Sequence, residues 1–181
     1  MPTIEEKLLL YRVKMKRDPD AFAVLYDRYV SPVYRYVYFK VSHKQEAEDI
    51  TSDVFLKAWQ YLIEEEQPDI GSFQQFIYAI ARNCVIDVYR ARVKKMTFEL
   101  DTAIELPEPG SLAERVAIGS DMERLLGTIK KLKQEYQDVI LLRYVEELSP
   151  GEIAEVLGKS HVSVRVTLHR AVKKLQELSA V

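Results

Sequence analysis

The sequence contains few of the residues from which disulfides, metal sites and catalytic centres are usually built. Cys84 is its only cysteine, and its three histidines do not cluster. A single cysteine excludes an intrachain disulfide and favours a reducing compartment. We find no Gly-rich phosphate loop, no Ser/His/Asp or Cys/His set and no paired carboxylates of a catalytic kind. The sequence therefore predicts neither an enzyme nor a protein with a metal or another cofactor.

Long apolar runs are also missing. No segment is long and apolar enough for a membrane span, and the N-terminus lacks the apolar core of a signal peptide. We therefore expect a soluble, cytoplasmic protein without membrane insertion. Hydrophobic residues still make up 48% of the 181 residues, which is enough to form a buried core.

The net charge gives no sign of nucleic-acid binding by itself. The chain has 26 basic and 28 acidic side chains, and its net charge is −2. The distribution along the chain is more informative. Residues 96–123 hold seven acidic side chains and one basic one, Arg115, whereas the segments on either side are close to neutral or slightly basic. An acidic middle segment therefore separates two parts of the chain.

Apolar periodicity predicts helices and no strands. The helical repeats cover residues 20–41, about 45–62, 72–95, a segment from about 120, and 134–145. Between them, residues 96–117 lose the periodicity and contain two prolines and a glycine, which is typical of a linker. We predict an all-α fold of two helical domains, residues 1–95 and 120–181, joined by an acidic flexible linker over residues 96–119.

Residues 148–175 predict a helix-turn-helix. Ser149 and Glu152 have the spacing of a capping box, and Pro150 suits the first helical position. Gly158 ends this short helix, because glycine adopts the left-handed conformation at little cost. Ser160 caps a second helix two residues later. Two helices joined by so tight a turn are typical of the motif.

The second helix of this motif has two different sides. Val164, Leu168, Ala171 and Leu175 are spaced as a buried stripe, whereas the opposite side is basic and has no carboxylate before Glu177. Such a side suits a recognition helix, because cations contact phosphates and other side chains read the edges of bases. The alternative is a solvated basic face on an ordinary helical hairpin.

Residues 45–62 carry acidic and polar side chains away from their apolar stripe. These are Glu48, Asp49, Ser52 and Asp53. They form either an acidic docking patch for a partner or a group of first-turn acids that complement the helix dipole. The spacing alone leaves both interpretations open.

Residues 72–95 combine aromatic, amide and basic side chains on the side opposite their apolar stripe. This set comprises Gln74, Tyr78, Arg82, Asn83, Tyr89 and Arg90. The mixture suits single-stranded nucleic acid, where bases stack on rings and phosphates need cations. The alternative is a solvated amphipathic helix.

Three stretches, in this order, resemble bacterial sigma factors. Residues 47–59 (AEDITSDVFLKAW) and 72–83 (SFQQFIYAIARN), followed by Asp87 and Arg90, resemble sigma region two. Residues 152–158 (EIAEVLG) through 168–171 (LHRA) resemble region four. Their order, their spacing and the short linker resemble the extracytoplasmic-function group, which keeps only these two domains. The resemblance covers roughly residues 18–178.

The resemblance implies an alternative sigma factor, which is not an enzyme by itself. Such a subunit binds core RNA polymerase, recognises the minus-thirty-five and minus-ten promoter elements and starts transcription. Domain two of the family binds the clamp coiled coil of the beta-prime subunit, and the matching positions here are Asp49, Ser52 and Asp53. The minus-ten surface of the family corresponds to the loop before Ser72 and to Tyr78, Arg82, Asn83 and Arg90.

Domain four of the family binds the beta flap and the minus-thirty-five element of promoter DNA. The matching positions are Arg165, Val166, Thr167, His169, Arg170 and Lys173. Val166 and Thr167 stand where the family usually has serine and arginine, so we expect fewer phosphate contacts and an unusual minus-thirty-five sequence; Val166 suits a thymine methyl group. The family commonly has an anti-sigma factor as a further partner, for which the apolar faces offered to polymerase are natural targets.

One rival interpretation and one finer hypothesis remain. A dimeric helix-turn-helix regulator that binds duplex DNA without polymerase explains residues 148–175 equally well, but it does not explain the acidic patch or the basic and aromatic side of residues 72–95.

The finer hypothesis is that Asn83 and residues 64–71 form a pocket for one unstacked base, because an amide offers both a donor and an acceptor.

Overall fold

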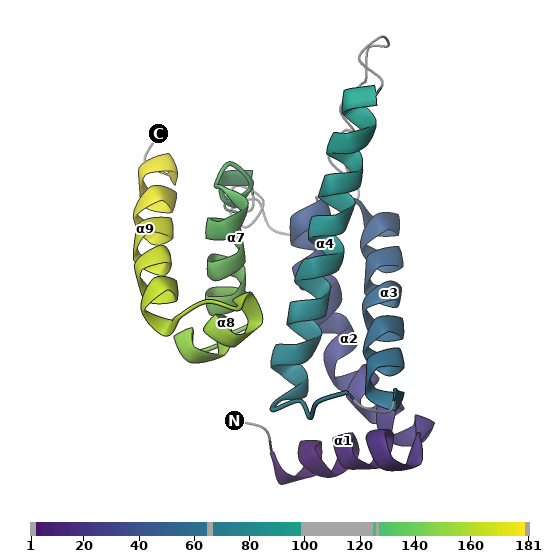
Figure 1. Ribbon diagram of the computed structural model, residues 1–181. Coiled ribbons are helices and arrows are strands. Elements are labelled where there is room, and N and C mark those ends of the chain that lie inside the picture. The colour runs from purple at the N-terminus through teal and green to yellow at the C-terminus, as the bar shows by residue number, and fades with distance from the viewer. Residues whose placement is uncertain (1–2, 65–66, 99–124, 126, 180–181) are drawn as a thin grey trace. The chain divides into compact units, whose positions relative to one another are not determined.

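The computed structural model describes residues 3–64, 67–98, 125 and 127–179. Within these ranges all regular structure is helical, and the chain forms two compact units, Met1–Pro109 and Gly110–Val181 (Figure 1). The predicted all-α class with two helical domains is confirmed. The predicted linker lies largely outside the described residues, so its end near residue 119 stays a prediction.

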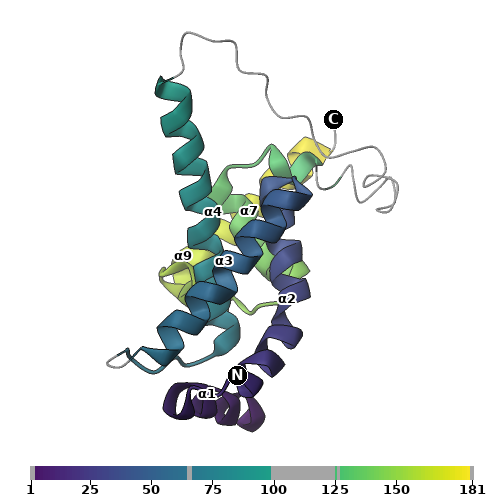
Figure 2. The same cartoon turned by 90° about the vertical axis from the view of Figure 1, so that its right-hand side faces the viewer.

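The described residues of the first unit form four helices. They are α1 (Ile4–Lys16), α2 (Pro19–Val41), α3 (Lys44–Ile63) and α4 (Phe73–Phe98). α2, α3 and α4 pack against one another, and α1 crosses the end of this bundle where α4 begins (Figures 1 and 2). α4 extends to Phe98, so the first residues that we assigned to the linker are helical.

Aromatic rings join the three long helices of this unit. The ring of Phe22 on α2 meets Phe55 and Trp59 of α3 and Phe73 of α4 edge to face, with ring centroids 5.1 to 6.5 Å apart. Aromatic pairs favour this geometry and stabilise a core beyond the area that they bury. These four rings therefore serve packing.

The start of α2 follows its sequence signals. The Asp18 carboxylate accepts hydrogen bonds from the backbone N–H groups of Asp20 and Ala21, and Pro19 occupies the first helical position. These bonds, together with Arg12, lower the pKa of Asp18. The helix ends at Ser42, which has a left-handed backbone.

α1 was not predicted from the sequence. Thr3 caps it, but its apolar residues do not form a single stripe. Leu9, Leu10 and Val13 are buried, whereas another set is exposed on the opposite side: Ile4, Leu8, Tyr11 and Met15. Because apolar residues occupy both sides, the pattern lacks the amphipathic contrast by which helices are found in a sequence.

The second unit contains α7 (Gln134–Ile140), α8 (Pro150–Leu157) and α9 (His161–Ser179). α7 continues into one π-helical turn, Leu141–Val145, in which the N–H of Glu146 donates to the carbonyl of Leu141 at 3.0 Å. The helix predicted over residues 134–145 is therefore present, with a widened last turn. Part of the helix expected from about residue 120 lies outside the described residues.

The helix-turn-helix forms through the predicted signals. Ser149 and Glu152 form both halves of a capping box, and Gly158 ends α8 with a φ of 61°. The Ser160 hydroxyl accepts a hydrogen bond from the Ser163 N–H at 3.2 Å at the start of α9. The Ser149 hydroxyl and N–H both donate to the Glu152 carboxylate, and these bonds lower its pKa.

We predict that this capping box stabilises the second unit in a pH-dependent way. Ser149→Ala should lower the free energy of unfolding by about 1 kcal/mol at neutral pH. A lowered folded-state pKa means that the contribution of Glu152 is present above its unfolded pKa and is lost as the pH falls through the folded value. The difference between the wild type and Glu152→Gln should therefore shrink at acid pH in urea unfolding. A difference that is constant from neutral to acid pH would contradict this role.

Candidate nucleic-acid and protein interfaces

α9 has one exposed side that carries most of the predicted groove-reading residues. Val164 and Ala171 are fully buried on its other side. Five of the predicted contact residues are exposed: Arg165, Val166, His169, Arg170 and Lys173. Val162, which is 71% exposed, extends this side toward the start of the helix. The exposed side therefore offers cations for phosphates together with apolar groups for base edges.

Thr167, a contact position implied by the family resemblance, does not lie on this exposed side. Thr167 is only 8% exposed. It lies three residues after Val164 and four before Ala171, so the helical repeat turns it toward the core, where α9 packs against α7 and α8. We therefore leave Thr167 out of the proposed contact set.

α3 presents a polar stripe that faces away from the bundle. Asp49, Ser52 and Asp53 are exposed along it, as is Glu48. The Ser52 hydroxyl donates to the Glu48 carbonyl at 2.9 Å, and the Gln45 amide donates to Asp49 at 3.4 Å. Among the described residues, neither Asp49 nor Asp53 forms an ion pair. The two carboxylates are therefore available to a cationic partner.

Leu56 lies on the same stripe and was missed by the sequence reasoning. It is 54% exposed and follows Asp49 by seven residues, which is two helical turns. Leu56 was overlooked because an apolar residue next to the buried Phe55 does not stand out from the apolar stripe in the sequence. We name Asp49, Ser52, Asp53 and Leu56 the α3 stripe. A shallow hollow of about 360 Å³ adjoins it, lined partly by Tyr26, Tyr34 and Ser52.

Part of the predicted nucleic-acid side of α4 lies on the surface. Asn83 and Arg90 are exposed, and Arg82 is half-buried. The Arg90 guanidinium lies 3.7 Å from the Asp87 carboxylate, in an exposed pair that contributes little to stability. Asn83 and Arg90 are seven residues apart, so they lie on the same side of the helix.

The placement of Tyr78 on this surface is wrong. Tyr78 is 1% exposed, and its ring meets that of Tyr36 edge to face, with centroids 5.6 Å apart. α4 packs against both α2 and α3, so its buried sector is wider than the single stripe that periodicity indicated. Ile77, Ala81 and Val85 belong to the same buried sector.

Lys57 of α3 is a second residue that the sequence reasoning missed. Its ammonium group lies 3.4 Å from the sulfur of Cys84, the neighbour of Asn83 in the chain. The contact brings an exposed cation beside the exposed side of α4. Burial raises the pKa of the Cys84 thiol, so the thiol is protonated at neutral pH and is no nucleophile.

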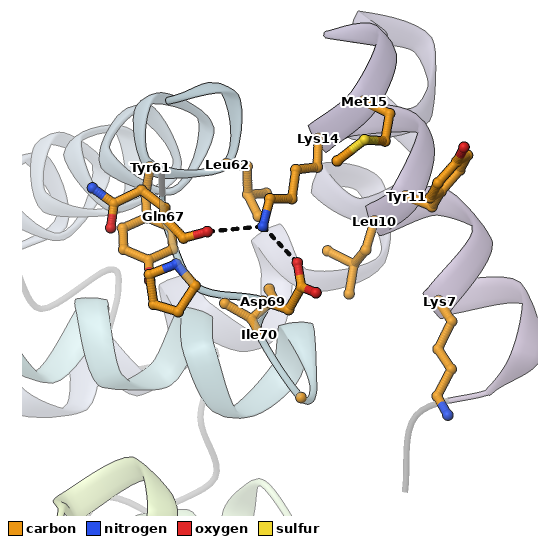
Figure 3. A pocket seen from close by; sticks show the side chains of 12 residues that line it. Lys7, Leu10, Tyr11, Lys14, Met15, Tyr61, Leu62, Gln67, Asp69 and Ile70 are labelled. Carbon is orange, nitrogen blue, oxygen red and sulfur yellow. Dashed lines mark hydrogen bonds and ion pairs between the residues drawn. The ribbon is translucent and has the colours of Figure 1, made fainter. Parts of the chain in front are cut away.

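A cavity of about 490 Å³ lies beside the loop that precedes α4 (Figure 3). It is lined by residues of α1, by Tyr61 and Leu62 of α3, and by residues 67–71. Asn83 is not among the lining residues, and it lies ten residues beyond Phe73, about 15 Å along the helix axis. This cavity is therefore not the pocket predicted for Asn83 together with residues 64–71, and that pocket stays a prediction.

Comparison with known proteins decides the family. Residues 25–95 match the sequence pattern of Sigma-70 region 2, and residues 122–175 match that of Sigma-70, region 4. The chain is 31% identical to the ECF RNA polymerase sigma factor SigW of Bacillus subtilis, over 95% of this chain and 97% of SigW. This chain belongs to the extracytoplasmic-function sigma factors.

Other comparisons agree with this assignment. The chain is 33% identical to the ECF RNA polymerase sigma factor BldN of Streptomyces coelicolor over 89% of its length, and it spans 61% of BldN. The fold resembles that of CnrH in complex with the cytosolic domain of CnrY, with a TM-score of 0.72 at 22% identity over 97% of each chain. It also resembles RpoE of Bartonella quintana in complex with the anti-sigma factor NepR, with a TM-score of 0.69 at 21% identity over 88% of this chain and 97% of RpoE.

As an alternative sigma factor, the protein has RNA polymerase and promoter DNA as its partners. In the part of the chain that the structure describes, no helix is long and apolar enough to cross a membrane. The same residues contain no group of three or more side chains arranged to hold a metal ion.

Proposed function

We propose that the two units of this sigma factor divide promoter recognition between them. Residues 1–95 dock on the beta-prime clamp of core polymerase and read the minus-ten element, and residues 120–181 bind the beta flap and read the minus-thirty-five element. The observation that carries this proposal is that the α3 stripe and the exposed side of α9 have opposite charge and lie on separate units.

The α3 stripe suits a basic protein surface. Asp49 and Asp53 lie four residues apart on one side of α3, so both can meet cations of the same partner. Leu56, exposed beside them, supplies an apolar anchor that gains free energy when a partner covers it. This combination of charge for specificity and a buried apolar group for affinity is typical of a protein interface.

The α4 side suits the melted minus-ten strand. Asn83 offers a donor and an acceptor to the exposed edge of one base, and Lys57, Arg82 and Arg90 offer cations to the phosphates around it. We propose that residues 67–71 contact the same strand at a separate point, because Asn83 does not line the cavity beside these residues.

We also propose that an anti-sigma factor regulates the protein in the cytoplasm. Both solved relatives, CnrH and RpoE, are bound to another protein, CnrY in one case and the anti-sigma factor NepR in the other. Leu56 and Val162 are exposed apolar groups on the two proposed interfaces, so a partner that covers them would block polymerase and DNA together. The protein has no catalytic role of its own in this proposal.

The first prediction concerns docking on polymerase. Asp53→Arg reverses the charge of an exposed residue, so it should leave folding intact and weaken binding to core polymerase. Asp27→Arg makes the same change at an exposed position of α2 outside the stripe and should bind like the wild type. Comigration with core polymerase in gel filtration measures the difference. Equal binding of both variants to core polymerase would exclude the α3 stripe as the docking site. Strong binding of promoter duplex by the wild type in the absence of polymerase would favour the dimeric regulator.

The second prediction concerns the minus-thirty-five element. Arg165→Ala should cost about 1–3 kcal/mol of binding if the guanidinium reads a guanine, with relaxed specificity at one position. If Arg165 contacts only phosphate, affinity should fall evenly across sequences and the salt dependence should decrease. Transcription from a promoter library at two salt concentrations separates the two outcomes, with Lys174→Ala, an exposed residue paired with Glu177, as the control. Unchanged transcription from every promoter would refute both.

The third prediction concerns strand opening. Asn83→Ala should weaken discrimination at one base of the minus-ten element by about 1–3 kcal/mol. It should impair transcription from a duplex promoter much more than from a pre-melted bubble, because the bubble removes the cost of unstacking. The ratio of initiation rates on the two templates is the measurement. The same base preference in wild type and variant would rule out Asn83 as the reading group.

A further inference from the structure

α1 holds the loop of residues 67–71 through Lys14. The Lys14 ammonium donates to the backbone carbonyl of Gln67 at 2.8 Å and also pairs with the carboxylate of Asp69. Figure 3 shows the lysine reaching from α1 across the cavity to both groups. One side chain therefore ties two points of the loop to a different helix, more than 50 residues away in sequence.

The end of the same loop is held by Glu6. This glutamate is 4% exposed, and its carboxylate accepts the N–H of Phe73, the first residue of α4, at 3.0 Å. Its other oxygen accepts the hydroxyl of Tyr29 at 2.8 Å. Burial and the Glu6 carboxylate raise the pKa of Tyr29, so its hydroxyl stays a donor. Glu6 thus accepts the N–H of the first residue of α4.

We propose that Lys14 is a positioning residue that sets the shape of residues 67–71 for the minus-ten strand. Glu6 fixes where the loop enters α4, and Lys14 fixes the loop before that point, so α1 determines the path between them. The inference rests on the proposed reading of the minus-ten strand by the first unit. The positioning role of Lys14 gives a function to α1, which lies outside residues 25–95, the segment that matches the region 2 pattern.

The two bonds of Lys14 differ in their exposure to solvent and therefore in strength. The Asp69 side chain is 89% exposed, so water and salt screen its attraction to the lysine. The Lys14 side chain is 24% exposed, and its bond to the Gln67 carbonyl is partly buried. A charge-assisted bond to a backbone carbonyl restricts the chain itself and is stronger than a neutral one. Most of the positioning should therefore come from the bond to Gln67.

The chain offers a matched control on the same helix. Lys7 lines the same cavity but makes no hydrogen bond to residues 67–71 among the described contacts. Lys7→Met and Lys14→Met make the same chemical change at two separate positions of α1. Lys14→Arg keeps the charge and the donors, and Asp69→Ala removes the exposed partner without altering α1.

The test uses polymerase holoenzyme on a duplex promoter, on the same promoter with a pre-melted bubble, and on versions with changed minus-ten bases. Lys14→Met should reduce initiation from the duplex by about tenfold relative to Lys7→Met, which is the loss of one charge-assisted bond. Lys14→Met should also bring the ratio of initiation rates, between promoters with preferred and with changed minus-ten bases, closer to one. Lys14→Arg should restore both values largely, and Asp69→Ala should have a smaller effect. Core binding should match that of Lys7→Met, and the unfolding temperature should fall by no more than the loss of this one bond explains.

Three results would decide against the inference. Lys14→Met could behave like Lys7→Met on every template while Asn83→Ala still impairs duplex opening, which would refute the positioning role and leave the proposed function in place. Lys14→Met could lower core binding and the unfolding temperature in proportion to initiation, with Asp69→Ala silent, which would make Lys14 a merely structural residue. If Asn83→Ala also leaves base preference unchanged, the proposed reading of the minus-ten strand fails together with the inference.

Discussion

The first unit depends on one buried carboxylate. Glu6 binds the N–H of Phe73 and the hydroxyl of Tyr29, so it joins α1 to the start of α4 and to the middle of α2. A buried carboxylate is costly unless hydrogen bonds satisfy it, and both of its oxygens accept one here. The helix dipole of α4 adds a favourable interaction at the same point. Because this bond fixes where α4 begins, it also fixes the height along the bundle at which Asn83 and Arg90 face outward.

The interfaces follow from what the cores leave exposed. In the first unit, α2, α3 and α4 each bury a sector against two neighbours, which leaves narrow outer sides for the α3 stripe and for Asn83. In the second unit, α9 buries Val164, Thr167 and Ala171 and leaves its cations outside. None of the residues proposed to contact polymerase or DNA is fully buried, so they can vary in charge without loss of the fold. This separation explains why we expect Asp53→Arg to change binding and not stability.

The sequence was most informative where local chemistry determines the structure. Ser149, Glu152 and Gly158 act on groups within a few residues in the chain, and each occupies its predicted place at the ends of α8. It was least informative where two distant elements meet. Tyr78 was placed outside because periodicity was read as one stripe, whereas a helix with two neighbours buries a wider sector. Thr167 was included only because its position matches the recognition helix of the family, and its burial follows from the helical repeat of α9. α1 has apolar residues on both sides, and the bond from Lys14 to Gln67 spans 53 positions, so neither leaves a pattern in a single sequence.

The charge on α9 explains why such a protein needs polymerase. Its exposed side offers Arg165, Arg170 and Lys173 as cations, and each neutralises about one phosphate at most. Three such contacts give a salt dependence with a slope of only about −3, far below that of repressors that bind DNA unaided. In the proposed arrangement, docking of the α3 stripe on polymerase holds the second unit near the promoter through the same chain, and the local concentration of this unit rises without any new contact. Weak binding by α9 alone is then an advantage, because promoter contact is made only by molecules already bound to polymerase.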